Sequence, residues 1–306
     1  TRPVKVISRP DQYVGVTTFT GNGGTQSIDV GHEPDLVWLK DRGAGEHHGL
    51  FDTIRGPLMR LTSDYTYAST SRANTVTSFN NNGVTLGSAG EYNGSTDPIV
   101  CWSWKAGGSK NTFNVDDVGY ASAAAAGLDG GTLTVTGASV GTKQGFSIIK
   151  YTGSGNAGDS ASHGLLEAPK FIITKNIDNG TYSWRVFTTV IDGSNDRLFL
   201  NATTTKADQT DAPVPTSSLF YVGSNLDHNK ANDNIIAYLW HDVPGLQKFG
   251  TYEGNNSTDG PYIELGFRPS IIIFKNIDSE TPNWEIYDFT ERDKTNPYGK
   301  VLSPNT

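Results

Sequence analysis

The histidines are the first residues whose chemistry could define a site, and of the six in the chain only His47 and His48 are adjacent. With Glu46 and Asp52 nearby, they would suit a metal or an acid–base site. However, neighbouring residues of a strand point to opposite faces, and a zinc site needs three or four converging ligands. We therefore expect a solvated loop, for which ligand contact by His47 and His48 is the best functional alternative.

Other patterns suggest chemistry but lack a required part. Residues 192–196 and 227–233 alternate oxygen side chains as calcium loops do, yet neither has the closing glutamate of an EF-hand. Residues 153–158 match the letters of a dinucleotide fingerprint, but no helix follows to hold a pyrophosphate. No Gly-x-Ser-x-Gly elbow with a partnered histidine appears, while paired glycosidase carboxylates stay open because their separation depends on the fold. We predict no catalytic residue, no metal and no cofactor.

Six tryptophans offer flat apolar faces for packing or for stacking on sugar rings. Trp102, Trp104 and Trp240 lie in apolar alternating stretches, so we expect them in the core. Trp184 and Trp284 follow polar loops, which makes them candidates for partly exposed ligand contacts.

The elements that must position these residues follow one pattern, which occurs three times, at residues 31–42, 165–176 and 266–276. Each copy has a proline, a polar residue, four mostly β-branched or aromatic residues, then a lysine and a turn-former. An aromatic-x-Gly turn precedes each copy. An apolar run bounded in this way predicts a buried strand with a fixed start and end.

The copies are spaced like small domains, because Pro34, Pro169 and Pro269 lie farther apart than solenoid or propeller repeats allow. A second matching strand, at 99–107 and at 235–242, closes the first two units. Because strand side chains alternate, Val100, Trp102 and Trp104 share one face of the first of these strands. The equivalent face of the second carries Ile236, Tyr238 and Trp240. The third unit reaches Thr306 before such a strand, so we expect that the chain continues or that another chain completes this unit.

We expect an all-β fold of tandem antiparallel β-sandwich modules, because turn residues separate many short apolar runs and no long helical periodicity appears. The segment after the first unit contains one alternating stretch, 132–136, which we interpret as an edge strand within a linker. The expected boundaries are an N-terminal connector at 1–14, repeat 1 at 15–108, the linker at 109–144, repeat 2 at 145–245 and an incomplete repeat 3 at 246–306.

Composition narrows the choice of partners. The 306 residues have a formal net charge of -8 and no cluster of lysine and arginine. Nucleic-acid affinity depends mainly on basic side chains at phosphates, so we expect no nucleic-acid partner. No apolar run approaches the ~18 residues of a membrane span. No signal peptide opens the given sequence, which begins with Thr1 and not Met, so processing or trimming of the terminus stays open as the reason. The single cysteine, Cys101, excludes an intramolecular disulfide framework and is expected to be a buried apolar side chain.

Several short segments of the chain resemble motifs of a known family of proteins. They are residues 19–23, 34–40, 51–56 and 101–108, the last containing Trp-Lys-Ala-Gly-Gly, together with 241–245 and 248–252. This set resembles the repeat modules of tail-fibre and other virion structural proteins of marine tailed phages, such as cyanophages, and the resemblance extends over about residues 15–305. It implies a virion component exposed to the medium and supplies no catalytic residues to carry over. The chain departs from the family by stopping in mid-module.

We therefore predict a non-enzymatic virion protein on the extracellular particle, a tail-fibre or adhesin subunit for host attachment and receptor binding. The alternatives are a capsid-surface decoration protein and a glycan-degrading depolymerase. Expected partners are other virion proteins and a host cell-surface glycan or outer-membrane protein, and family analogy implies a homo-oligomer, a trimer. Because the copies diverge in the loops after their strands, ligand contacts are expected there, from His47, His48, Tyr182, Trp184 and Trp284.

Overall fold

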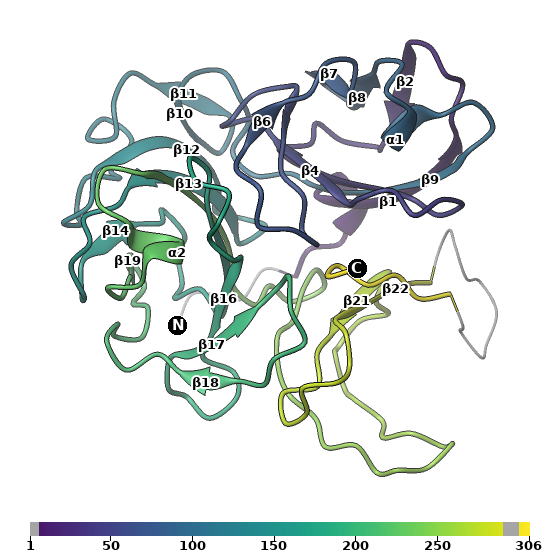
Figure 1. Ribbon diagram of the computed structural model, residues 1–306. Coiled ribbons are helices and arrows are strands. Elements are labelled where there is room, and N and C mark those ends of the chain that lie inside the picture. The colour runs from purple at the N-terminus through teal and green to yellow at the C-terminus, as the bar shows by residue number, and fades with distance from the viewer. Residues whose placement is uncertain (1–5, 290–299) are drawn as a thin grey trace.

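A computed structural model describes residues 6–289 and 300–306 and shows an all-β protein. Three groups of strands lie around a common centre (Figure 1). The first unit, residues 14–104, is drawn in purple and blue, and the second unit, residues 146–240, in teal and green. The third unit, residues 248–289 with 300–306, is drawn in yellow tones, and the C-terminus lies near the centre.

The first unit is a two-layered β-sandwich. Its larger sheet has the antiparallel order β1–β9–β3–β4, and the smaller sheet has the order β2–β8–β7. Val37, Leu39 and Cys101 of the larger sheet pack on Val84 and Leu86 of the smaller one, which confirms the predicted burial of Cys101. After a 3-10 turn η1 (Pro10–Gln12), the elements are β1 (Val14–Thr20), β2 (Gln26–Asp29), β3 (Leu36–Asp41), β4 (Gly49–Asp52), β5 (Met59–Arg60), β6 (Thr70–Ser71), β7 (Val76–Asn80), β8 (Gly83–Leu86), α1 (Gly90–Asn93) and β9 (Pro98–Trp104).

The second unit has the same central strand order and register. Its elements are β13 (Phe146–Thr152), β14 (Ser160–Ser162), β15 (Phe171–Asn176), β16 (Arg185–Thr188), β17 (Asp196–Phe199), β18 (Ala207–Asp208), β19 (Leu219–Tyr221), α2 (Leu226–Asn229) and β20 (Asn234–Trp240). The order β13–β20–β15–β16 matches β1–β9–β3–β4. Phe146 lies opposite Trp240, just as Val14 lies opposite Trp104. The pair β14–β19 forms the second layer over the core of this unit.

Residues 109–144 are not a linker with one edge strand. They contain β10 (Phe113–Val115), β11 (Val118–Tyr120) and β12 (Val135–Gly141), which extend the sheet of the second unit to nine strands. β12 lies inside this sheet, parallel to β10 and antiparallel to β13. The alternating stretch at 132–136 predicted the wrong bounds for β12. The residues of β12 that pair with β13 include Gly137, Ala138 and Ser139, which are small and produce no apolar alternation.

The third unit has two strands among its described residues, β21 (Ile271–Phe274) and β22 (Glu285–Asp288). Ile271 lies opposite Asp288, as Leu36 lies opposite Asp52 in the first unit. Residues 248–253, which follow the end of the second unit, form no strand.

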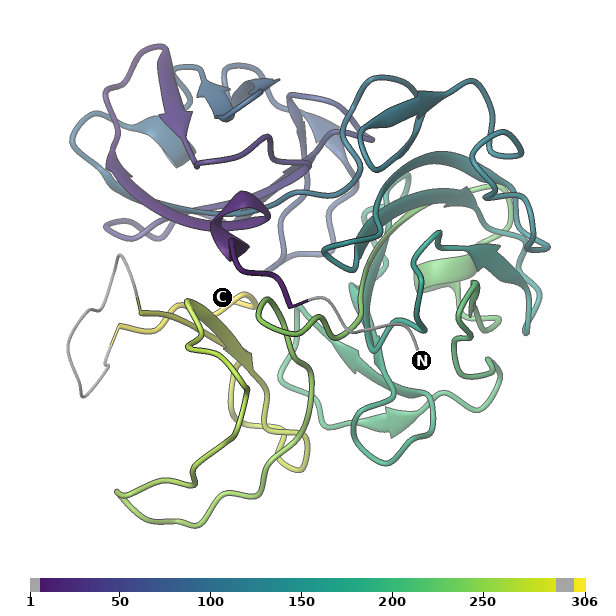
Figure 2. The ribbon, with the colours of Figure 1, turned by 180° about the vertical axis from the view of Figure 1, so that it is seen from behind.

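A large apolar cluster, here called the central cluster, fills the space where the three units meet. The faces of β3, β9, β15 and β20 that point away from the two sandwich cores contribute to it. Trp102 and Trp240 are buried there, which confirms the core prediction for these two, whereas Trp104 is half-buried and packs against the cluster. Figure 2 shows the same three units from behind, with the C-terminus between them.

Hydrogen bonds from side chains of the central cluster cross between units, and two of them involve equivalent strand positions. Tyr238 Oη donates to Asp52 Oδ2 at 2.6 Å, which connects the second unit to the first. Trp102 Nε1 donates to Asp288 Oδ2 at 3.2 Å, which connects the first unit to the third. Tyr238 and Trp102 hold the same position in β20 and β9, so equivalent side chains make both connections.

Candidate functional site

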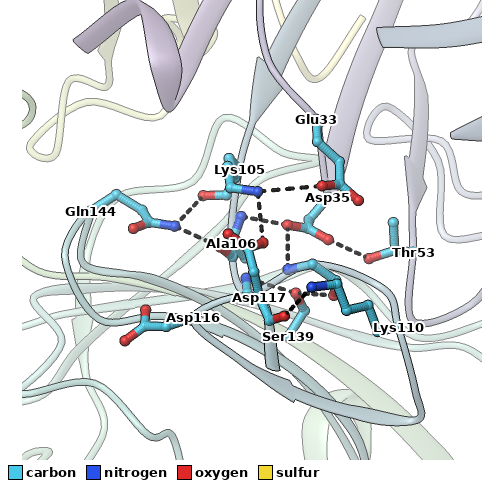
Figure 3. A network of polar contacts seen from close by, with 12 residues as sticks. Glu33, Asp35, Thr53, Lys105, Ala106, Lys110, Asp116, Asp117, Ser139 and Gln144 are labelled. Carbon is cyan, nitrogen blue, oxygen red and sulfur yellow. Dashed lines mark hydrogen bonds and ion pairs between the residues drawn. The ribbon is translucent and has the colours of Figure 1, made fainter. Parts of the chain in front are cut away.

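Asp35 is the centre of a buried polar network that joins the first unit to the nine-stranded sheet (Figure 3). Its carboxylate accepts hydrogen bonds from Ala106 N at 2.7 Å, Gly108 N at 3.0 Å and Thr53 Oγ1 at 2.9 Å. Burial raises the pKa of Asp35, although these three bonds act in the opposite direction. The bonds from Ala106 and Gly108 fix the chain after β9. Because Asp35 is fully buried, its carboxylate is inaccessible to a solute.

Ser139 lies within a Gly-x-Ser-x-Gly sequence, residues 137–141, but in the body of β12 and not at a turn. Its hydroxyl accepts from Gly107 N and donates to Gly108 O, both at 2.9 Å (Figure 3). A nucleophile elbow instead exposes its serine on a sharp turn between strand and helix. Ser139 is therefore a structural residue of the same network.

A polar cleft of about 390 Å³ opens beside the network. On its wall, Lys105 Nζ lies 2.7 Å from Asp117 and 3.6 Å from Glu33. Burial lowers the pKa of Lys105, but the hydrogen bond to Asp117 raises it, and the net pKa lies above the ordinary value. The ammonium therefore stays charged and paired. His32 also lines the cleft, and burial lowers its pKa to about 4. General acid–base catalysis works best with a group whose pKa lies near the working pH. Neither Lys105 nor His32 has a pKa near neutral pH.

Three carboxylates converge at Asp192, Asp196 and Asp208, with oxygens within 4.8 Å of one another. The first two belong to the stretch considered above for calcium. Lys206 Nζ lies among them, at 2.8, 3.0 and 3.5 Å respectively. Hydrogen bonds from Lys206 and Ser194 lower the pKa of Asp192, and bonds to Asp192 and Asp196 raise that of Lys206. The ammonium supplies the positive charge that a metal would bring, so the group is an ion-pair network.

Three of the residues expected to contact ligand are buried, and the prediction for them is wrong. His48 accepts a hydrogen bond from Trp38 Nε1 at 2.8 Å. Trp184 donates to the carbonyl of Thr62 at 2.8 Å, and Trp284 donates to a carbonyl of β17 at 2.8 Å. His48, Trp184 and Trp284 each precede an equivalent strand, β4, β16 or β22. Their rings turn inward because this position faces the central cluster and not solvent.

His47 points away from this interior and forms part of an exposed group of rings. Its Nδ1 lies 2.6 Å from Oδ2 of Asp64, a nearly buried carboxylate. The rings of Tyr65 and Tyr67 stack with centroids 4.8 Å apart and planes inclined by 12°, and His47 meets Tyr65 edge-on at 4.6 Å. The exposed fractions of the two tyrosines are 43% and 48%. We call His47, Tyr65 and Tyr67 the aromatic surface.

The loop that contains Tyr182 lies beside the aromatic surface. Thr66 Oγ1, between the two tyrosines, donates to Gly180 O at 2.6 Å. Tyr182 is half-buried, and its ring lies 5.8 Å from Lys230 Nζ. Residues 62–69 thus contact the predicted loops of both the first and the second unit.

Sequence reasoning did not identify Tyr65 and Tyr67. The available signal was a Tyr-x-Tyr alternation in a polar segment, which places two rings on one side of an extended chain. Such rings have an apolar face and a polar hydroxyl tip, so they stack on sugar rings and bond to their hydroxyl groups. The two stacked rings and the His47–Asp64 pair therefore present apolar faces and polar tips side by side at the surface.

Comparison with known proteins gives one match. A family model described as a domain of unknown function (DUF7483) matches residues 9–306. Neither the curated proteins nor the solved structures returned a match. Among the described residues, no helix has the length and apolar character needed to cross a membrane.

Proposed function

The chain belongs to the DUF7483 family, and from its own residues we propose that it is a non-enzymatic virion protein, a tail-fibre or adhesin subunit that attaches to a host surface. The aromatic surface is the observation that carries this proposal. The virion location rests on the resemblance of the repeat segments to tail-fibre modules.

The aromatic surface has the properties of a preformed contact site. His47 is held by the carboxylate of Asp64, and the stacked rings of Tyr65 and Tyr67 hold each other. Rigid side chains lose little conformational entropy when a ligand binds. An aromatic contact contributes about 0.5–1.5 kcal/mol beyond its buried area. Two rings that bind together thus favour a repeating ligand such as a cell-surface glycan.

The groups best suited to catalysis support the non-enzymatic part of the proposal. The carboxylate of Asp35 is buried and accepts three bonds, and the hydroxyl of Ser139 is used inside a strand. The carboxylates of Asp192, Asp196 and Asp208 are ion-paired with Lys206. Each group already has a structural role, which explains why it is present without a reaction.

The proposed partners are other virion proteins and a host glycan or outer-membrane protein. We extend the proposal to a homo-oligomer, a trimer, by analogy with fibre proteins built from small sandwiches. Light scattering of the purified protein tests this point, and a monodisperse monomer would contradict it.

The aromatic surface is tested by replacing Tyr65 and Tyr67 together with alanine. Binding of fluorescently labelled host envelope polysaccharide should weaken by about tenfold, since two stacking contacts are worth about 1–3 kcal/mol. Tyr262→Ala is the matched control, because Tyr262 is an exposed tyrosine, at 86%, outside this surface.

Equal binding by the double variant and the control would refute the aromatic surface as the contact site. Chain length of the polysaccharide is followed in the same samples. A steady loss of length would contradict the non-enzymatic proposal in favour of a depolymerase. If labelled antibody against the protein marks capsids and not tails in intact particles, a capsid-surface decoration protein replaces the tail-fibre assignment.

A further inference from the structure

An apolar groove of about 530 Å³ lies beside the third unit. One wall is the segment around Phe249, and the other is β21 with Ile271 and Ile273. Its floor is the central cluster, where Trp104, Phe171 and Trp240 line it. The groove therefore reaches the packed centre of the molecule.

The first two units show what belongs between such walls. In the first unit β9 lies between β1 and β3, and in the second β20 lies between β13 and β15. β21 matches β3 and β15, since its partner residue Asp288 corresponds to Asp52 and Thr188. In the described third unit β21 pairs only with β22, so the groove occupies the place of the central strand.

The exposure of β21 is consistent with a missing neighbour. All six residues of β3 are buried, whereas the four residues of β21, from Ile271 to Phe274, are only half-buried. A row of isoleucines at an unpaired sheet edge is an unfavourable surface unless a strand covers it.

The aromatic-x-Gly turns give independent support. A Cβ on Gly21 would lie 2.1 Å from Gly94 O, and one on Gly153 would lie 2.3 Å from Lys230 O. Both carbonyls belong to the segment that leads into β9 or β20. Gly254, in the third turn, has no atom within 4 Å of its added Cβ. Among the described residues of the third unit, no segment lies against Gly254 as these segments lie against Gly21 and Gly153.

We propose that this groove binds one extended peptide segment, which adds to the free edge of β21 as an antiparallel strand in the place of β9 and β20. Main-chain hydrogen bonds to β21 supply affinity, and side-chain pockets supply selectivity, as in other cases of strand addition. The occupant has an aliphatic residue, an aromatic residue and a tryptophan at alternate positions facing the central cluster. This pattern is taken from Val100, Trp102 and Trp104 and from Ile236, Tyr238 and Trp240.

The lining explains why an apolar aromatic strand is the occupant. The rings of Phe171 and Phe249 stack at 5.6 Å, and Phe171 lies 6.0 Å from Trp240. A tryptophan from the added strand would extend this row, as Trp240 extends that of Phe146 at 4.7 Å. A strand with charged inward side chains would bury them without partners, at a large desolvation cost.

The test uses the protein of residues 1–306 and a fluorescently labelled synthetic peptide with the sequence of residues 234–240, flanked by lysines for solubility. Anisotropy should show saturable one-to-one binding. A peptide with serine in place of its tyrosine and tryptophan should bind at least about tenfold more weakly, because it loses two large buried side chains.

Two protein variants locate the binding. Ile273→Ser, in the groove, should weaken peptide binding, whereas Ile263→Ser, at an exposed isoleucine outside it, should not. If Ile273→Ser does not fold, as judged by circular dichroism, Phe249→Ser replaces it on the opposite wall.

Three results of the binding experiments would overturn the proposal. They are no saturable binding, equal binding of both peptides, and equal binding by the groove and control variants. Concentration-dependent dimerisation that Ile273→Ser abolishes would show that a second copy covers the groove, and would also overturn it.

Discussion

At the scale of single residues, the buried imidazoles make stability depend on pH. Burial lowers the pKa of His32 to about 4, of His163 to about 4 and of His228 to about 3. Their contribution is complete above pH 6.5, the ordinary value, and is lost as pH falls toward 3, because the unfolded chain then binds protons that the folded chain excludes. We predict that the free energy of unfolding, measured in urea, is lower at pH 4.5 than at pH 7.

His228→Gln identifies the source of this loss. Glutamine retains an oxygen to accept the bond that Gly223 N donates to His228 Nε2 at 3.1 Å, but it does not titrate. The variant should be less stable than the wild type at pH 7 because ring packing on Phe187 is lost. The difference between its stabilities at pH 7 and pH 4.5 should be smaller. An unchanged difference would assign the acid sensitivity to other groups.

The tryptophans show how far residue-level prediction extends. Trp102 and Trp240 were predictable because their own strands alternate apolar residues. Trp184 was not, because its burial depends on the carbonyl of Thr62, in another unit and far away in sequence. The stacked pair Tyr65 and Tyr67 was missed for the related reason that exposure is a property of the surrounding fold.

At the scale of elements, the aromatic-x-Gly turns position the strand pairs. Gly21→Ala and Gly153→Ala should each lower the free energy of unfolding by about 1–3 kcal/mol, because the added Cβ meets a backbone oxygen that cannot move freely. Gly254→Ala is the matched control and should be nearly neutral, since nothing lies near its Cβ. Chemical denaturation measures all three. Equal losses would mean that backbone freedom, not close approach, selects glycine here.

The strands of the repeated pattern were predictable because each copy carries its own start and end signals. β12 was not, because Gly137 and Ser139 pair through their backbones and give no apolar alternation. The helix α2 also escaped prediction, because tertiary contacts support so short a helix. The side chain of Asn229 in α2 donates to the carbonyls of Gly223 and Asn156, contacts that no local sequence pattern indicates.

At the scale of the whole molecule, stability should be shared between units through the central cluster. Tyr238 is buried and its Oη donates to Asp52, which also forms a 2.6 Å ion pair with Arg55. Burial raises the pKa of Tyr238, so the hydroxyl remains a donor at all ordinary pH values. The second unit therefore completes the hydrogen bonding of a buried carboxylate in the first unit, which couples the folding of the two.

Tyr238→Phe removes this bond and keeps the ring. We predict a loss of about 1.5–3 kcal/mol in the free energy of unfolding, as expected for a hydrogen bond to a charged group. Hydrogen exchange should accelerate in β4 of the first unit as well as in β20. Tyr151→Phe is the control, because its Oη donates to His228 O at 2.7 Å within the second unit, so faster exchange should stay in that unit. If Tyr238→Phe leaves exchange in β4 unchanged, the units fold independently and the central cluster only joins them.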